Sequence, residues 1–188
     1  MPLIRRRPRP IKFWVQFWRD RRGASAVEFA FIAPVLVLFY CGMSELTEAM
    51  IAQRRLSHIA SSIGDVVARD TQLTDARRTD VFKVGSVLMA PFPTTGLRMC
   101  IVSITSNAAG TIDTVDWSEP SNSPTNCPAK GAVINIPASV LPAGGSVIMS
   151  KASYDYEPPV KLITKSGFTF RRTFYLRPRL SDQVLRVP

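Results

Sequence analysis

A single carboxylate, Glu28, lies within an otherwise uncharged stretch that directly follows basic residues and a glycine. Residues 24–44 contain no other formal charge, and Arg21, Arg22 and Gly23 precede them. A helix of about 20 apolar residues spans a bilayer, whereas a carboxylate within hydrocarbon costs about 2.5 kcal/mol or more. The stretch therefore predicts a membrane-spanning helix whose acid either has a partner or lies at the depth of the lipid headgroups.

A cut after Gly23 would create such a partner. Ala24 would then be the first residue and Glu28 the fifth, so that a new α-amine and a carboxylate would lie one helical turn apart. Paired as ammonium and carboxylate, within one subunit or between neighbours, they would remove most of each other's desolvation cost in a low-dielectric bundle. An unpaired Glu28 at headgroup depth remains the alternative interpretation.

Residues 22–30 of this chain have the sequence RGASAVEFA and are followed by Pro34. They resemble the processing site of type IV pilin-like proteins. The match is closer to the TadE-like family of pseudopilins from the tight-adherence (Flp) pilus system, and it covers about residues 21–45. The resemblance implies that a prepilin peptidase cleaves between Gly23 and Ala24. It also implies that Glu28 and Phe29 serve subunit assembly and register, with other pilins, pseudopilins and assembly platform proteins as partners. Phe29 stands where major Flp pilins usually carry Tyr, which favours a minor pilin or pseudopilin.

The basic residues are concentrated ahead of the apolar stretch. Residues 1–22 hold eight of the 24 Lys and Arg and one of the 14 acidic residues, so that +7 of the net charge of +10 lies there. Because Lys and Arg stay on the cytoplasmic side, residues 1–23 are expected to form a cytoplasmic leader that contacts anionic lipid rather than nucleic acid. As a helix, its aromatic residues 13, 14, 17 and 18 would form one face at the membrane interface; a leader in which these aromatics are incidental is the alternative. We expect a single-pass protein of the bacterial inner membrane with a periplasmic head.

The elements that must position this stretch follow it along the chain. Apolar residues recur at spacings of three and four from Leu46 to Val67, which predicts that the helix continues as an amphipathic half to about residue 68. Thr74 or Asp75 is expected to cap a second helix with an apolar face at positions 81, 84, 85, 88 and 89. Residues 45–96 are thus expected to form a helical stalk and a second helix.

The amino-acid composition changes at residue 97, and residues 97–188 predict a β-rich head. Stretches rich in β-branched and aromatic residues are separated by clusters of Gly, Pro, Asn and Ser, which is typical of antiparallel strands and turns. The predicted strands are 97–105, 111–117, 132–136, 146–156 and 168–176. The predicted fold class is α+β and pilin-like, with a long N-terminal helix, half transmembrane and half amphipathic, packed on a small antiparallel sheet.

The three cysteines fit a head outside the cytoplasm. Cys41 lies in the apolar stretch, which leaves Cys100 and Cys127 in the head. A bridge between them would stabilise the fold by about 3–4 kcal/mol and suits an oxidising periplasm; two independent thiols are the alternative.

Catalytic motifs are absent from the sequence. No Cys or His cluster has zinc spacing, and no Gly-rich loop precedes a phosphate-binding Lys. His58, the only histidine, is expected to be a partly buried structural residue, and Asp113, Asp116 and Glu119 are expected to be solvated among turns. We therefore predict neither an enzyme nor a cofactor or metal site.

Two functional hypotheses follow. In the first, the protein is a TadE-like minor pseudopilin of Tad/Flp pilus assembly, processed after Gly23 and associated through its apolar helix, while its head primes, caps or joins the pilus. In the second, it is an uncleaved membrane-anchored scaffold or adhesin in which Glu28 lies at the interface.

Overall fold

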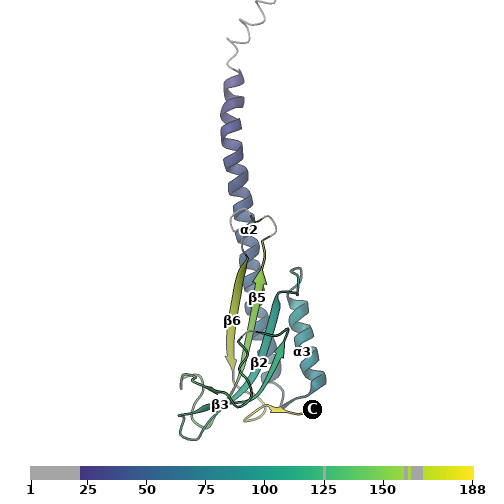
Figure 1. Ribbon diagram of the computed structural model, residues 1–188, viewed down its shortest axis with the longest axis vertical. Helices are drawn as coiled ribbons and strands as arrows, with labels where there is room; N and C mark the ends of the chain where they lie inside the picture. The colour runs from purple at the N-terminus through teal and green to yellow at the C-terminus, as the bar shows by residue number, and fades with distance from the viewer. Residues whose placement is uncertain (1–21, 125, 159–160, 162–166) are drawn as a thin grey trace, which may run out of the picture. The chain divides into compact units, whose positions relative to one another are not determined.

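The computed structural model describes residues 22–124, 126–158, 161 and 167–188. The expected leader lies largely outside the described residues, including its aromatic face at positions 13, 14, 17 and 18. The chain divides into two compact units, Met1–Ser44 and Glu45–Pro188. One continuous helix, α2 (Arg22–Ala68), contributes to both units and runs through Pro34 without a break (Figure 1).

A five-stranded antiparallel sheet forms the centre of the second unit. Its strand order is β4-β3-β2-β5-β6. The strands are β2 (Leu97–Ser106), β3 (Asp113–Ser121), β4 (Val133–Ile134), β5 (Ser146–Tyr156) and β6 (Phe168–Leu176). The structure thus confirms the predicted α+β class, and the bounds of β5 and β6 are those predicted from sequence.

Strand β3 is longer than the sequence indicated. It continues through Pro120 to Ser121, where Pro120 is paired with Cys100 of β2. On its other side β3 pairs with β4 only at Asp113 and Thr114. A proline is tolerated at an unpaired strand edge because the donor it lacks is not needed there.

The second half of α2 packs against one face of this sheet. Leu56, Ile59, Ile63 and Val67 are at most 1% exposed and belong to the main core cluster, as their spacing predicted. Their partners on the sheet include Leu97, Met99, Ile101, Ile148 and Tyr154. Leu46 and Met50 were assigned to the same stripe but are about half exposed, because the core contacts of α2 begin at Ala49 and Ala52.

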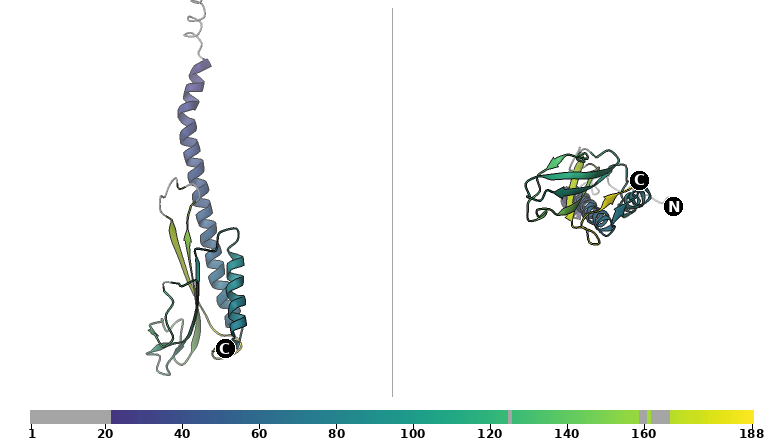
Figure 2. Two further views of the ribbon diagram at one scale, coloured as in Figure 1. Left: turned by 45° about the vertical axis from the view of Figure 1, so that its right-hand side comes forward. Right: turned by 90° about the horizontal axis from the view of Figure 1, so that it is seen from below.

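Helix α3 (Asp75–Leu88) covers the same side of the sheet as the second half of α2 (Figure 2). The hydroxyl of Thr74 caps it by accepting a hydrogen bond from the backbone amide of Arg77 at 3.2 Å, as one of the two predicted caps. Val81, Phe82 and Gly85 are buried, but Val84, expected on the same face, is 47% exposed. A short parallel pair of β1 (Gln72–Leu73) and β7 (Leu185–Arg186) joins the C-terminus to this region and was not predicted.

A glycine lets α2 approach the sheet closely. A Cβ placed on Gly64 would lie 2.5 Å from Leu176 Cδ1 and 2.9 Å from Ser150 Cβ. The Leu176 methyl group can rotate away, but Ser150 Cβ is fixed to the backbone of β5. The distance between helix and sheet is therefore limited by the absence of a side chain at position 64.

Replacing this glycine tests the packing. We expect Gly64→Ala to lower the free energy of unfolding of the full chain in detergent micelles by about 1–3 kcal/mol, the usual cost of overpacking, measured by chemical denaturation. Ser62→Ala, at a half-buried position of the same helix, serves as the control. Equal stability of the Gly64→Ala variant and the wild type would show that the helix is not held this close to β5.

Candidate functional site

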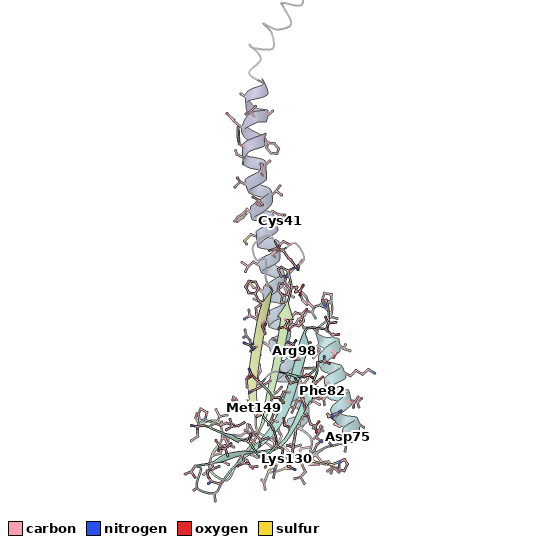
Figure 3. All side chains as sticks on the ribbon, in the orientation of Figure 1. Cys41, Asp75, Phe82, Arg98, Lys130 and Met149 are labelled. Carbon is pink, nitrogen blue, oxygen red and sulfur yellow. A yellow bond between two sulfur atoms is a disulfide. The ribbon has the colours of Figure 1, made fainter. Side chains whose placement is uncertain are left out.

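The first half of α2 presents apolar side chains that the chain itself does not cover. Every residue from Gly23 to Tyr40 is exposed except Ala33, which is half-buried. Phe29, Phe31 and Tyr40 are 67%, 77% and 75% exposed, and side chains project from all around this part of the helix (Figure 3). A large uncovered apolar surface marks a site for membrane or protein contact. In the described part of the chain, α2 is the one helix long and apolar enough to cross a membrane.

Glu28 lies on this apolar surface one turn after Ala24. A rise of 1.5 Å per residue separates the two residues by about 6 Å along the helix axis. Glu28 is exposed and forms no ion pair with any described residue. The carboxylate is thus available to a group outside the described chain.

Gly23 is unconstrained by packing. A Cβ placed on it would meet no atom within 4 Å, in contrast to the crowded Gly64. Glycine in a helix costs about 1 kcal/mol relative to alanine, so this residue weakens the start of α2 without serving a contact inside the protein. The backbone at Gly23 is accordingly open to approach by another molecule.

In the head, Cys100 and Cys127 form a disulfide across a sequence separation of 27 residues, with Cα atoms 5.8 Å apart. The bridge attaches the loop after β3 to the central strand β2. Cys41 is a free thiol on the first half of α2 (Figure 3).

The three carboxylates expected in turns instead lie on β3 and make specific contacts. Asp113 is buried and accepts a hydrogen bond from the amide of Ile136 at 2.9 Å. Asp116 accepts hydrogen bonds from the hydroxyls of Ser103 and Thr105 on β2. The prediction that they are solvated was wrong because strand pairing brings donors from β2 and from the residues after β4 to them.

Glu119 holds the C-terminus against α3. Its carboxylate forms ion pairs with Arg78 at 2.9 Å and with Arg186 at 2.7 Å. Arg186 also pairs with Asp75, and this hydrogen bond is the main reason that the pKa of Asp75 lies below its ordinary value. These contacts are structural, since each charge in the group is neutralised by a neighbour.

The remaining candidate residues form no metal-binding cluster in the described part of the chain. His58 is exposed on α2 rather than partly buried. No group of three or more His, Cys, Asp or Glu that could hold a metal occurs among the residues that the structure describes. Sequence reasoning did miss one grouping, Arg98, Lys151 and Arg171 on the outer face of the sheet, because their proximity depends on strand register.

These features define a class: an α+β protein with one N-terminal apolar helix suited to anchoring in a membrane and a disulfide-bonded head. Residues 23–64, which lie entirely within α2, match the model of the TadE-like protein family. The match confirms the resemblance predicted from the sequence, and it covers this segment of the chain. No curated protein and no solved structure matches the chain.

The disulfide gives a direct chemical prediction. Alkylation of the unfolded but unreduced protein should add one label, on Cys41, whereas reduction before alkylation should add three, as counted by intact mass. The double variant Cys100→Ser, Cys127→Ser should lose about 3–4 kcal/mol of unfolding free energy, because a loop of this length is no longer closed in the unfolded state. Cys41→Ser is the control and should leave the stability unchanged. Three labels without reduction would show that the bridge does not form.

Proposed function

We propose that this protein is a non-catalytic minor pseudopilin that takes part in Tad/Flp pilus assembly. The observation that carries the proposal is the uncovered apolar first half of α2, because it lies within residues 23–64, the segment that matches the TadE-like family. A soluble domain would bury such a surface in its own core, whereas an assembly subunit keeps it for lipid and for neighbouring helices.

Processing after Gly23 is the first step of the proposed mechanism. A prepilin peptidase hydrolyses the Gly23–Ala24 peptide bond, which leaves a carboxylate on the leader and a new α-amine on the mature chain. A Cβ at position 23 would meet no atom of the described residues within 4 Å beyond the adjoining helix, and the proposal assigns the need for glycine to the peptidase, which must bring its own groups close to the backbone.

Pairing of the new terminus with Glu28 is the second step. An α-amine has an ordinary pKa of about 7.7–8.0, so it is mostly charged at neutral pH. An ion pair between this ammonium and Glu28 of the same or a neighbouring subunit offsets the cost of placing either charge in hydrocarbon. Because the pair forms at one depth only, it also fixes the register between adjacent helices.

In this proposal the leader faces the cytoplasm and the head lies in the periplasm. Helix 24–44 associates with other pilins or pseudopilins and with assembly platform proteins, while the head primes, caps or joins the growing pilus. The disulfide in the head suits an oxidising compartment.

A bulky residue at the cut tests processing. We expect Gly23→Leu to block cleavage, so that the protein recovered from membranes keeps Met1 and its full mass, whereas wild type begins at Ala24. Ser44→Leu places the same side chain at an exposed position of α2 outside residues 22–30 and should be processed normally. A Gly23→Leu protein with the mature mass, or a wild type that retains Met1 in cells containing the peptidase, would contradict the proposal and favour the uncleaved scaffold.

Neutralising Glu28 distinguishes a role of its carboxylate in pilus assembly from a role in cleavage after Gly23. We expect Glu28→Gln to be cleaved normally but to lower the amount of assembled pili more than about tenfold, because the new ammonium then lacks a counter-charge in hydrocarbon. Sheared surface pili are quantified by immunoblot. Glu157→Gln removes an exposed carboxylate of the head and is the control. Wild-type piliation of the Glu28→Gln strain would refute the pairing mechanism.

A further inference from the structure

A small basic cleft lies on the face of the sheet opposite α2. It has a volume of about 100 Å³ and is lined by Arg98, Lys151, Ser153 and Arg171 among others, with no Asp or Glu in its lining. Strand register explains the grouping. Arg98 of β2 lies opposite Ser153 of β5, which in turn lies opposite Arg171 of β6. Lys151 is two residues before Ser153 and therefore on the same face of β5 (Figure 3 labels Arg98).

Two of these cations form no direct ion pair with a carboxylate in the described part of the chain. The Lys151 ammonium is half-buried and donates a hydrogen bond to the backbone carbonyl of Asn126 at 3.2 Å. Burial lowers the pKa of Lys151. Neither Lys151 nor Arg171 forms an ion pair within the described residues, whereas Arg98 is paired with Asp155.

A fourth cation, Arg172, also lines the cleft, but its guanidinium is hydrogen-bonded to other groups of the protein. Its Nε donates to Ser57 Oγ on α2 at 2.9 Å, and its Nη1 donates to the carbonyl of Arg171 at 2.8 Å. Asp155 follows Lys151 on the same strand. Its carboxylate accepts hydrogen bonds from Arg98 and from the hydroxyl of Thr169, the latter at 2.8 Å. The charge of Lys151 consequently has no carboxylate partner among the described residues, and Arg171 has only the longer-range attraction of Asp155.

A disulfide and a hydrogen bond hold the loop beside the cleft against the sheet. Cys100 lines it, and the disulfide from Cys100 holds the loop that carries Asn126 beside β5. The same loop is attached to β2 by a hydrogen bond from Asn122 Nδ2 to the carbonyl of Leu97 at 2.9 Å. A site whose walls are already ordered binds its ligand with less loss of conformational entropy.

We propose that this cleft binds a tetrahedral oxyanion, namely the phosphate group of a ligand. Lys151, Arg171 and the Ser153 hydroxyl supply donors from two strands, and such charge-assisted hydrogen bonds to phosphate are the strong ones. The cleft, about 100 Å³ in volume, is large enough for a single oxyanion. The inference is independent of the proposed role in pilus assembly, because it uses only residues of the head.

Titration with inorganic phosphate tests the site. The probe is added to the full chain in detergent micelles free of phospholipid, and binding is followed by calorimetry. We expect saturable binding that Lys151→Met and Arg171→Gln each weaken about tenfold or more, the effect of losing one charge-assisted contact. Lys83→Met, at an exposed position of α3, should bind as wild type does. Arg171 is exposed, so its variant tests binding even where Lys151→Met impairs folding, and circular dichroism checks the fold of each.

Three outcomes would overturn the inference: no saturable binding by wild type, equal affinity in all variants, or acetate binding as tightly as phosphate. A second experiment identifies the source of the phosphate group. Binding of inorganic phosphate to the full chain is measured in nanodiscs that contain phosphatidic acid and in nanodiscs that lack it. Loss of inorganic phosphate binding in the phosphatidic acid nanodiscs alone supports the site and assigns a lipid headgroup as its ligand. Unchanged binding supports the site and assigns a soluble phosphate ester.

Discussion

Burial of one stripe of α2 against the sheet is the interaction on which the head depends. Leu56, Ile59 and Ile63 are almost completely removed from solvent, and each such side chain contributes about 1.5–3 kcal/mol. The alternation of β2 and β5 supplies the complementary apolar face, and Gly64 permits the close approach. Because this half of α2 covers one face of the sheet, many apolar side chains of that face would be exposed to solvent without it.

The same helix carries a second apolar surface with a different physical character. Residues 52–67 are apolar on one side, as a helix on a sheet should be, whereas residues 24–44 are apolar all round and exposed. The one-sided pattern allows α2 to pack against the sheet. The described residues leave most of the second surface uncovered, which supports the proposal that lipid and other subunits surround it, with Glu28 as the one charge they must accommodate.

Charges in the head fall into two groups that the structure separates. Glu119, Arg78, Arg186 and Asp75 neutralise one another and tie the C-terminus to α3. Lys151, by contrast, is half-buried with only a backbone carbonyl beside it. Compensated charges explain stability, while an uncompensated cation in an ordered cleft indicates a place for a ligand.

The sequence by itself determined whatever depends on neighbours along the chain: the length of α2, the cap at Thr74, the limits of β5 and β6, and the TadE-like segment. These follow from helical spacing, strand alternation and local capping. Only the tertiary structure decided the contacts of the β3 carboxylates, the parallel pair of β1 and β7, and the basic cleft. The reason is register: a shift of one residue between paired strands would move Lys151 or Asp116 to the opposite face, and nothing local in the sequence fixes that alignment.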